Sequence, residues 1–523
     1  LKYELLGTGN GQTRLTFNGR VYFDIYSYSK PTFLPASLLN NAPGAYSSEN
    51  YNYSNNQESN QYKIGTRAEL IFTPYFKNED FYLTMLARYE TVQSKRSIQS
   101  IGQSGLINGI TSPTVLAYIR SMSNDPGTIK TADQNFIFNS HFSYKERYIV
   151  GFSLRGDGSS SFGPETPWFV SPSVSLRYNI SDEKFFEPLR KTISMLGLRA
   201  SWGINGNVNS VGSYQYATTM SLSSSGYNFG NTMDTWRDSA SPSTRLANPG
   251  LSWETSHQID VGIEGRMFGD KLSFEFDWYD KRTHDLITSL TAPGHTGASS
   301  MYINAGKVLN TGFEAMVSWK QVLGDFNYGI SVNGATLKNQ VLEGTSAERV
   351  QGERVWQSDY VTYFETGYPI WYLRTYHMDG IDPNTGAAIY KDYDGDGSIT
   401  QNDRDYVGKG IPDLTYGITL NFGWKNFDLT IYGTGAQGVE KLFSMQRGDF
   451  REANTLKYFW DNSWAPGKSS YIFPKPNKLD TFYIASDAMV FDASFFKVKQ
   501  IQLGYTLPQS VLKKIKMSQL RAY

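Results

Sequence analysis

One short segment of the sequence has the residue types and spacing to hold a hard cation. Alternating carboxylates can converge on one ion, a glycine permits the sharp turn between them, and a backbone carbonyl can add a further ligand. The spacing is that of an EF-hand-like loop with Asp instead of Glu at the last position. The segment contains Asp392, Asp394, Asp396, Gly397, Ser398 and Asp403.

The same pattern also fits an acidic, solvated turn that binds no ion, and Asp at the last position shortens the reach for bidentate contact. The sequence predicts a structural Ca²⁺ with Asp392, Asp394, Asp396, Ser398 and Asp403 as ligands. Such an ion would stiffen a long loop. No cofactor for catalysis is expected.

Large aromatic residues crowd the long polar segments between the predicted strands. Their rings can stack on sugar faces or grip peptide side chains, but aromatic residues also pack loops and form interfacial girdles. Both interpretations stay open. The candidates for substrate or loop contacts are Trp236, Trp356, Tyr360, Trp371 and Tyr372.

Motifs for other chemistry are missing from the sequence. There is no cysteine, and the histidines are scattered without metal-ligand spacing. A Gly-x-Ser-x-Gly elbow and a phosphate-binding loop are also absent. Lys+Arg and Asp+Glu balance at 49 each, so no net charge draws the chain to nucleic acid. We expect a protein that is neither an enzyme nor a nucleic-acid binder.

The elements that must position these residues are strands with period-two alternation. In the stretch from Lys271, Leu272, Phe274, Phe276 and Trp278 alternate with Ser273, Glu275 and Asp277. The Arg155–Gly158 run is expected to form a structural turn. The predicted strands span about 12–26, 62–73, 80–92, 132–144, 148–156, 168–180, 192–203, 255–267, 271–284, 310–320, 326–337, 413–424, 427–435 and 494–507.

Most connections between these strands alternate between short turns and long polar segments, but those near 157–167 and 181–191 are similar in length. Short turns on one side and long loops on the other are typical of outer-membrane barrels. The period-two alternation is interrupted in the last full strand, where Phe496 and Val498 are out of phase with Ile501 and Leu503. A β-bulge would explain that slip. The fold class is therefore all-β, a transmembrane antiparallel barrel. The alternative is a secreted all-β protein that binds or cleaves glycans.

Several segments resemble SusC/RagA-type TonB-dependent transporters, in that family's order. They include FSYKERYIVGFSLRGDGSSSFG from Phe142, LGLRASWGINGN from Leu196, NAGKVLNTGFEAMVSW from Asn304 and SFFKVKQIQLGYTLP from Ser494. The segment DYDGDGSITQNDRDYVGKGIPDLTYGITLNF from Asp392 belongs to the same set. The match extends from about residue 130 onward and is loose before it.

The resemblance implies an outer-membrane barrel of about 22 strands that is filled by a plug. It also implies TonB-dependent import of oligosaccharides or peptides, a SusD-like surface lipoprotein as partner and a host among the Gram-negative Bacteroidota. Residues 1–523 are then part of such a barrel, with about 14 to 15 strands present. The plug, the early strands, the last strand and the N-terminal region that contacts TonB are expected to lie outside this sequence.

Overall fold

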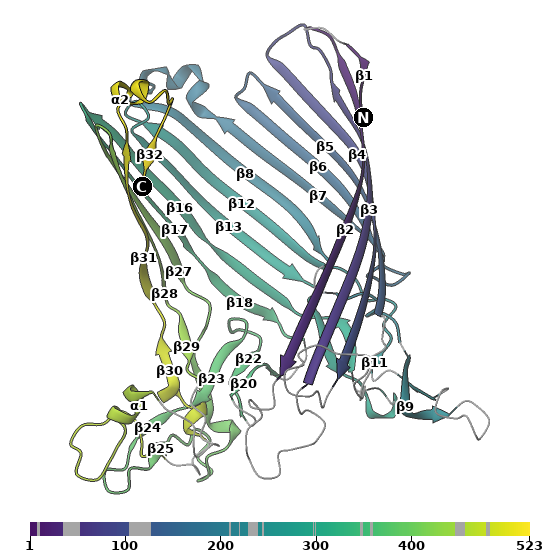
Figure 1. The fold of residues 1–523 in the computed structure, drawn as a ribbon, viewed down its shortest axis with the longest axis vertical. Coiled ribbons are helices and arrows are strands. Elements are labelled where there is room, and N and C mark those ends of the chain that lie inside the picture. The colour runs from purple at the N-terminus through teal and green to yellow at the C-terminus, as the bar shows by residue number, and fades with distance from the viewer. Residues whose placement is uncertain are drawn as a thin grey trace.

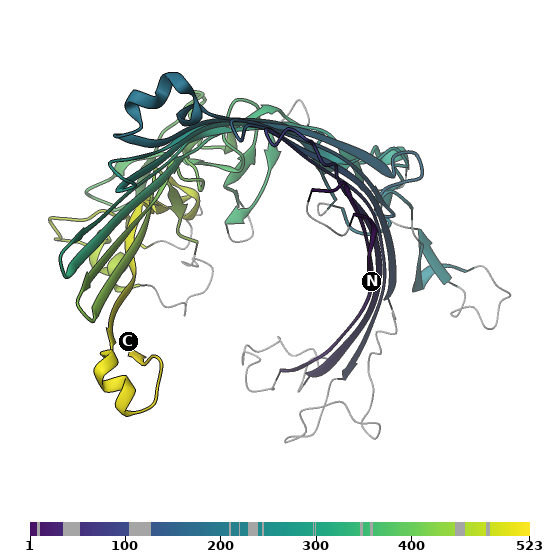
Figure 2. The ribbon, with the colours of Figure 1, turned by 90° about the horizontal axis from the view of Figure 1, so that it is seen from above.

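The long strands of the chain belong to one curved antiparallel sheet of 17 strands. The computed structural model describes residues 1–7, 11–34, 53–103, 127–208, 211–218, 220–228, 239–242, 245–296, 298, 300–345, 349–355, 359–444, 456–476 and 482–523. Successive long strands are neighbours in the sheet, and they tilt steeply across it (Figure 1). Seen from above, the sheet curls into an open arc (Figure 2). It therefore has a concave and a convex face.

The strands of the main sheet match all the predicted ranges, and β2 to β5 are longer than predicted. The extensions are polar and continue the antiparallel ladder beyond the apolar part of each strand, where paired backbone groups need no apolar side chains. The strands are β1 (Lys2–Leu6), β2 (Arg14–Leu34), β3 (Tyr53–Thr73), β4 (Phe81–Gln103), β5 (Gly127–Tyr144), β6 (Tyr148–Ser159), β7 (Trp168–Asn179), β8 (Ile193–Asn207), β12 (Glu254–Met267), β13 (Leu272–His284), β16 (Lys307–Leu323), β17 (Phe326–Thr336), β18 (Lys338–Glu343), β27 (Leu414–Trp424), β28 (Phe427–Gln437), β31 (Phe495–Thr506) and β32 (Arg521–Ala522).

Three details of the main sheet differ from the sequence-based expectation. The short β1, which the alternation did not reveal, pairs with β2. After a break at Leu337, β18 continues from β17 along the same neighbour, β16. The Arg155–Gly158 run lies inside β6 and is not a turn. Its alternation is broken by glycines, so the strand was predicted to end too early.

The predicted bulge in the last long strand is confirmed. Tyr432 of β28 pairs with Gln500, and the next residue, Gly433, pairs with Val498. Lys499 is therefore the extra residue. This slip places Phe496 and Val498 on the same face of the sheet as Ile501.

Most connections sort by length as predicted, with short turns at one end of the strands and long segments at the other (Figure 1). The β6–β7 connection at the long end is an exception, because it is shorter than the β7–β8 connection at the short end. In the β5–β6 turn, Lys145 and Glu146 have φ values of 55° and 57°. Two successive residues with positive φ give a turn whose twist matches that of the flanking strands. The connection between β7 and β8 also lies at the short end, where it forms the 3-10 helices Ile180–Asp182 and Lys184–Leu189.

The long segments contain small sheets and short helices of their own. Within the described ranges, no helix combines the length and apolar character needed to cross a membrane. The helices are α1 (Lys457–Asn462), α2 (Gln509–Lys514) and the 3-10 helices Gly294–Thr296, Gln401–Asp403, Tyr483–Ala485 and Asp487–Met489. The short strands are β9 (Met220–Asn228), β10 (Ser239–Pro242), β11 (Arg245–Leu246), β14 (Ile287–Thr291), β15 (Ser300–Asn304), β19 (Val350–Gln351), β20 (Arg354–Val355), β21 (Asp359–Tyr360), β22 (Thr362–Phe364), β23 (Tyr372–Tyr376), β24 (Met378–Ile381), β25 (Ala388–Tyr390), β26 (Arg404–Gly408), β29 (Glu440–Leu442) and β30 (Val490–Asp492).

Hydrophobic cores lie in the long segments. One cluster joins Val355, Val361 and Tyr376 to Ile484 and Ala485, so the segment between β18 and β27 packs against the segment between β28 and β31. We call these two packed segments the loop cap. The cap holds the predicted cation loop and all three described aromatic candidates, Tyr360, Trp371 and Tyr372, at one end of the sheet.

Candidate functional site

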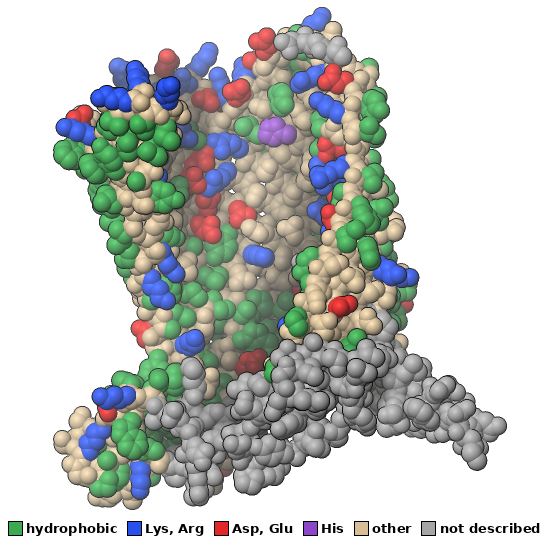
Figure 3. All heavy atoms as spheres, viewed as in Figure 1, with side chains coloured by type: hydrophobic (Ala, Val, Ile, Leu, Met, Phe, Trp, Pro, Cys, Tyr) green, Lys and Arg blue, Asp and Glu red, His purple; other side chains and the backbone are tan. Residues whose placement is uncertain are grey.

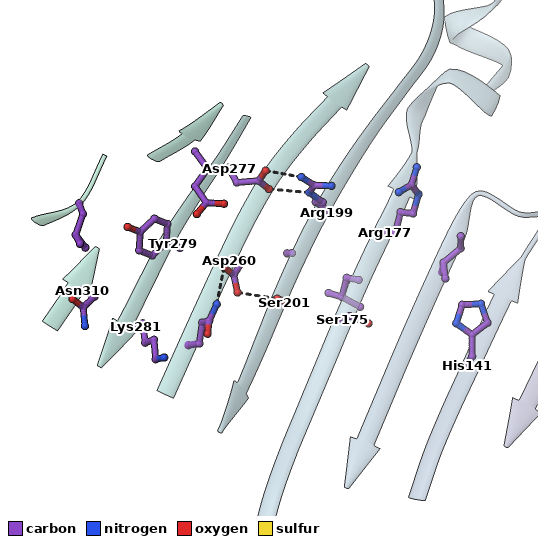
Figure 4. A pocket seen from close by; sticks show the side chains of 16 residues that line it. His141, Ser175, Arg177, Arg199, Ser201, Asp260, Asp277, Tyr279, Lys281 and Asn310 are labelled. Atoms are coloured by element: carbon purple, nitrogen blue, oxygen red, sulfur yellow. Dashed lines mark hydrogen bonds and ion pairs between the residues drawn. The ribbon is translucent and has the colours of Figure 1, made fainter. Parts of the chain in front are cut away.

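The two faces of the main sheet differ sharply in polarity. On β13, Glu275 and Asp277 line a hollow of the concave face, and Figure 4 shows Asp277 there. Phe276 and Trp278 alternate with them, so they point to the convex face, where they are 45% and 37% exposed. Figure 3 looks into the concave face and shows acidic and basic side chains gathered along its middle. A surface with this many exposed large apolar residues needs an apolar environment. The convex face therefore suits lipid, and the concave face suits water and polar ligands.

An ion-pair network links four strands on the concave face. Arg199 of β8 donates from Nη2 and Nε to the carboxylate of Asp277, at 2.5 and 2.8 Å. Its Nη1 lies 3.1 Å from Glu264 and its Nη2 lies 3.4 Å from Glu275. Arg177 of β7 pairs with the other carboxylate oxygen of Glu264. Glu264, Glu275 and Asp277 thus each lie beside a guanidinium from a neighbouring part of the sheet.

Cross-strand register explains how Arg199 and Asp277 meet although β12 lies between them. Gly262 of β12 is the direct partner of Arg199 on one side and of Asp277 on the other. A Cβ at this position would lie 1.8 Å from Asp277 Oδ1 and 2.9 Å from Arg199 Nε. The absence of a side chain at Gly262 therefore leaves the space that the ion pair occupies.

A hollow of about 860 Å³ surrounds this network on the concave face. Figure 4 shows labelled side chains from β5, β7, β8, β12, β13 and β16 directed to it. A neighbouring hollow of about 560 Å³ shares Arg199, Asp277 and Glu314. The residues that line the larger hollow include His141, Ser175, Arg177, Arg199, Ser201, Gln258, Asp260, Asp277, Tyr279, Lys281, Asn310 and Glu314. Such a surface offers many hydrogen-bond donors and acceptors to a polar ligand.

The pairing of charges continues along the concave face through the earlier strands. Arg67 lies 3.0 Å from Glu90, and Arg88 lies 2.5 Å from Glu69. In β6, Arg155 lies 2.7 Å from Asp157. The sequence did not reveal the pairs of Arg67 and Arg88, because the register between β3 and β4 that brings the partners together is not visible in the alternation of single strands.

In the loop cap, three of the four predicted carboxylate ligands converge. One carboxylate oxygen each from Asp392, Asp394 and Asp403 lie within 4.8 Å of one another. Gly395 and Gly397 turn the chain with φ values of 73° and 84°, a region that favours glycine. Asp396 is exposed, and its carboxylate does not belong to the converging group. It instead accepts a hydrogen bond from the N–H of the exposed Ser398 at 2.7 Å, and the predicted Ser398 carbonyl ligand stays a prediction.

Backbone N–H groups orient the converging carboxylates. Asp403 is fully buried and accepts bonds from the N–H groups of Thr400 and Tyr393, at 2.7 and 2.8 Å. The hydrogen bond from the Thr400 N–H contributes most to lowering the pKa of the Asp403 carboxyl. This carboxyl therefore stays ionised. Asp392 accepts from Gly395 and Gly397 at 2.7 and 2.8 Å. The three oxygens are therefore held where a hard cation could bind.

The residue after Asp403 fixes the cation loop to the rest of the cap. Arg404 is 2% exposed, pairs with Asp359 and donates to the hydroxyls of Tyr363 and Tyr376 at 2.9 Å each. It also donates to the Tyr360 carbonyl at 2.8 Å. This buried network joins β26 to β21, β22 and β23.

The aromatic candidates have different environments. Trp236 and Trp356 lie outside the described residues. The Tyr360 ring lies 4.1 Å from the Arg354 guanidinium. Trp371 is 47% exposed, whereas Tyr372 is 1% exposed, stacks on Tyr368 and donates its hydroxyl to Glu365. In this arrangement Trp371 can touch a ligand, and Tyr372 packs the cap.

Comparisons with known proteins agree on one family. The family model described as "TonB dependent receptor-like, beta-barrel" matches residues 3–504. TonB-dependent receptor P3 of Formosa agariphila is 27% identical over 405 residues, which cover 73% of this chain and 39% of that protein. TonB-dependent receptor SusC of Bacteroides thetaiotaomicron is 24% identical and covers 70% of this chain and 37% of that protein. The chain thus spans well under half of the length of these relatives.

A solved structure shares the fold. The structure described as the RagAB peptide transporter aligns with a TM-score of 0.79 at 20% identity, over 98% of this chain and 56% of that chain. The resemblance to SusC/RagA-type transporters that the sequence motifs indicated is confirmed, and so is the barrel fold class. The alternative of a secreted glycan-binding or glycan-cleaving protein is not supported.

Proposed function

Because this chain belongs to the TonB-dependent receptor-like β-barrel family, we propose that the full protein imports polar nutrients across the outer membrane along the concave face of the main sheet. The observation that carries the proposal is the contrast between the apolar convex face and the ion-paired concave face with its hollow of about 860 Å³. Lipid suits the first, and a hydrated ligand suits the second. The residues of the hollow bind and guide, and no bond is made or broken.

The substrate class that we propose is an oligosaccharide or a peptide. The wall offers hydroxyl, amide, carboxylate and guanidinium groups, and both classes carry matching donors and acceptors. One relative is SusC, and the structure with the same fold is described as a peptide transporter. The relatives from Formosa and Bacteroides support a host among the Bacteroidota.

We propose two protein partners for the complete transporter. A SusD-like surface lipoprotein would cover the loop cap, where Trp371 presents an exposed ring. TonB would act through a region outside this chain. Cryo-electron microscopy of the complex purified from the native host tests the first partner. We expect density for a lipid-anchored protein over the long-segment end, and density only at the short-turn end would contradict the proposal.

Uptake measurements test the import proposal. A strain that lacks the gene is compared with the same strain complemented by the full gene, using labelled oligosaccharides and peptides of similar mass. We expect the gene to restore uptake of one class, and a protonophore to abolish it. Equal uptake with and without the gene, or uptake that persists after depolarisation, would refute TonB-dependent import.

We also propose a structural Ca²⁺ held by Asp392, Asp394 and Asp403. The support is the convergence of their oxygens within 4.8 Å and the positive φ values that shape the loop. The ion would link both ends of the 392–403 segment and would have no direct part in substrate transport. Extracellular Ca²⁺ is abundant enough to occupy a weak site.

Terbium luminescence tests the ion, because Tyr393 lies inside the loop and can sensitise a bound lanthanide. We expect Asp392→Asn and Asp394→Asn each to weaken terbium and Ca²⁺ binding strongly. Asp396→Asn is the matched control, since that exposed carboxylate lies outside the converging group. Equal signals from all three variants and the parent would reject the site.

A further inference from the structure

The connection between β31 and β32 has the composition of a membrane-surface element. It lies at the short-turn end of the sheet and contains α2 (Figure 1). From Leu507 to Leu520 it contains Lys513, Lys514 and Lys516 and no acidic residue. Within the described part of the chain, none of these lysines takes part in an ion pair. We call residues 507–520 the basic rim segment.

Apolar side chains on this segment are held outward by its fold. Leu512 is 1% exposed and anchors α2, whereas Val511 and Ile515 are 42% and 47% exposed. The Ile515 N–H bonds to the Val511 carbonyl at 3.4 Å, so these two side chains lie one helical turn apart on the same side. The side chains of Met517 and Leu520 are also exposed, at 49% and 40%.

Backbone bonds give the segment a defined shape. The Met517 N–H bonds to the Leu512 carbonyl at 3.1 Å, and the Leu507 N–H bonds to the Leu520 carbonyl at 3.0 Å. The second bond closes the connection at the point where it leaves the sheet. The outward apolar side chains therefore belong to a compact unit that presents lysines and hydrophobic residues together.

Aromatic residues mark the depth of the segment in the membrane. Tyr505 packs against Phe427 with ring centroids 4.7 Å apart, and Trp424 of the neighbouring turn is 55% exposed. Such rings at the end of barrel strands sit at the level of the lipid head groups. Because α2 begins at Gln509, four positions after Tyr505, it lies at or just beyond that level.

We propose that the basic rim segment binds anionic phospholipid head groups of the periplasmic leaflet. Lys513, Lys514 and Lys516 would contact the phosphates, while Val511 and Ile515 insert between the first methylenes of the acyl chains. Charge complementarity selects this partner, since a segment with three lysines and no acidic residue attracts an anionic surface. Short turns of outer-membrane barrels face the periplasm, where the adjacent leaflet consists of phospholipid.

The inference requires the placement of the chain in the outer membrane, but it does not depend on the import of any substrate. It assigns to residues 507–520 a lipid-binding role that differs from the role of the concave face. A soluble acidic protein of the periplasm is the competing occupant, and the experiment below separates the two.

Lipid quenching of a single fluorophore tests the proposal on the full-length protein in lipid nanodiscs. This chain contains no cysteine, so Ser510→Cys introduces one labelling site within it. The discs contain phosphatidylcholine with about 30% phosphatidylglycerol, and the bromine quencher is placed on one or the other lipid. We expect brominated phosphatidylglycerol to quench the label about fivefold more effectively per molecule than brominated phosphatidylcholine. High salt should reduce that ratio.

A charge-removal variant and a matched control complete the test. Replacing Lys513, Lys514 and Lys516 by Gln should bring the quenching ratio to about one. Replacing Lys391, Lys457 and Lys475 in the loop cap by Gln removes the same charge at the other end and should leave the ratio unchanged. Variants are compared only when gel migration before and after heating shows that the barrel is folded. If the triple variant does not fold, the salt dependence of the quenching ratio in the parent protein still tests the proposal.

Three outcomes would overturn the proposal, and a fourth concerns the membrane placement itself. Equal quenching by both lipids in the parent, or an unchanged ratio in the triple variant, refutes head-group binding. Protection of the label by added periplasmic protein instead of lipid favours the competing occupant and also refutes it. A label at Val332→Cys, which is 44% exposed on the convex face, should be quenched by both lipids. Failure of that control would place the fault in the membrane assignment.

Discussion

Arg199 and Asp277 form a two-point ion pair across an intervening strand, with distances of 2.5 and 2.8 Å between their donor and acceptor atoms. They belong to β8 and β13, and the pair is formed above Gly262 of β12. The Arg199 guanidinium of β8 contacts Glu264 of β12 and Asp277 of β13. These three strands are therefore joined by side chains as well as by backbone hydrogen bonds. This relationship gives the first prediction.

Gly262→Ala should break the pair, because the new Cβ would lie 1.8 Å from Asp277 Oδ1. We expect a loss of about 1–2 kcal/mol in the free energy of unfolding, since the partly exposed pair is worth less than a buried one. Urea-dependent unfolding of the full-length barrel in lipid vesicles measures it. The control is Gly156→Ala, where the Cβ meets nothing within 4 Å. Equal effects of the two substitutions would show that the ion pair contributes nothing.

A charge placed on the convex face should be costly. Phe276 is 45% exposed on that face, and Phe276→Arg should destabilise the barrel by about 2–4 kcal/mol if it lies near the bilayer midplane. Asn333→Arg is the control, since Asn333 lines the concave hollow, where water can solvate the charge. Folding yields into vesicles and unfolding curves compare the two. A harmless Phe276→Arg would contradict the lipid-facing assignment.

Acid should loosen part of the loop cap through Glu365. Burial raises the pKa of this carboxyl, but hydrogen bonds from Arg349 and Tyr372 outweigh burial and hold the pKa below the ordinary value of 4.5. A lowered pKa in the folded state means that the stabilisation is complete above about pH 4.5 and is lost as the pH falls through the folded value.

Limited proteolysis of the cap between pH 6 and pH 3 checks this expectation, with an acid-active protease. Cleavage near Glu365 should increase below the ordinary carboxyl pKa in the parent. In Glu365→Gln the same region should be equally sensitive at both ends of the range. A parent cap that stays resistant at the acid end would show that this carboxyl does not control it.

Removing the buried guanidinium of Arg404 should open the cap without unfolding the barrel. Arg404→Met leaves Asp359 buried without its partner, and we expect a local cost of about 3–5 kcal/mol. Hydrogen exchange of the 359–376 segment should rise, while exchange in β12 and β13 stays slow. The double variant Arg404→Met with Asp359→Leu should recover much of the protection. No recovery would indicate that the tyrosine hydroxyls, and not the ion pair, hold the network.

The strands of the main sheet could be predicted because each one carries its own signal. Leu272, Phe274, Phe276 and Trp278 alternate with polar residues regardless of which strands lie beside them. The bulge at Lys499 was predictable for the same reason, since a phase slip is visible within one strand. β1 is too short for alternation to separate it from coil, and its pairing with β2 is what defines it.

The candidate site could be predicted only in part. The spacing of Asp392, Asp394 and Asp403 identified the converging carboxylates, but spacing alone could not exclude Asp396 from the group. The concave network went unseen, since the meeting of Arg199 and Asp277 depends on the register of three strands. Sequence also could not tell which of the adjacent rings of Trp371 and Tyr372 points into the cap, because that depends on how Tyr368 and Tyr406 pack against Tyr372.

The extra residue at Lys499 divides β31 into two stretches with independent phase. On one side of it Phe496 stacks on Tyr416 beside Gly433 and Gly435, and on the other Ile501 and Leu503 follow the apolar band. Because the bulge restores the phase, Phe496 and Val498 beside the loop cap face the convex side together with Ile501 and Leu503. The strand therefore presents one continuous apolar surface to the membrane, although its two stretches are out of phase in the sequence.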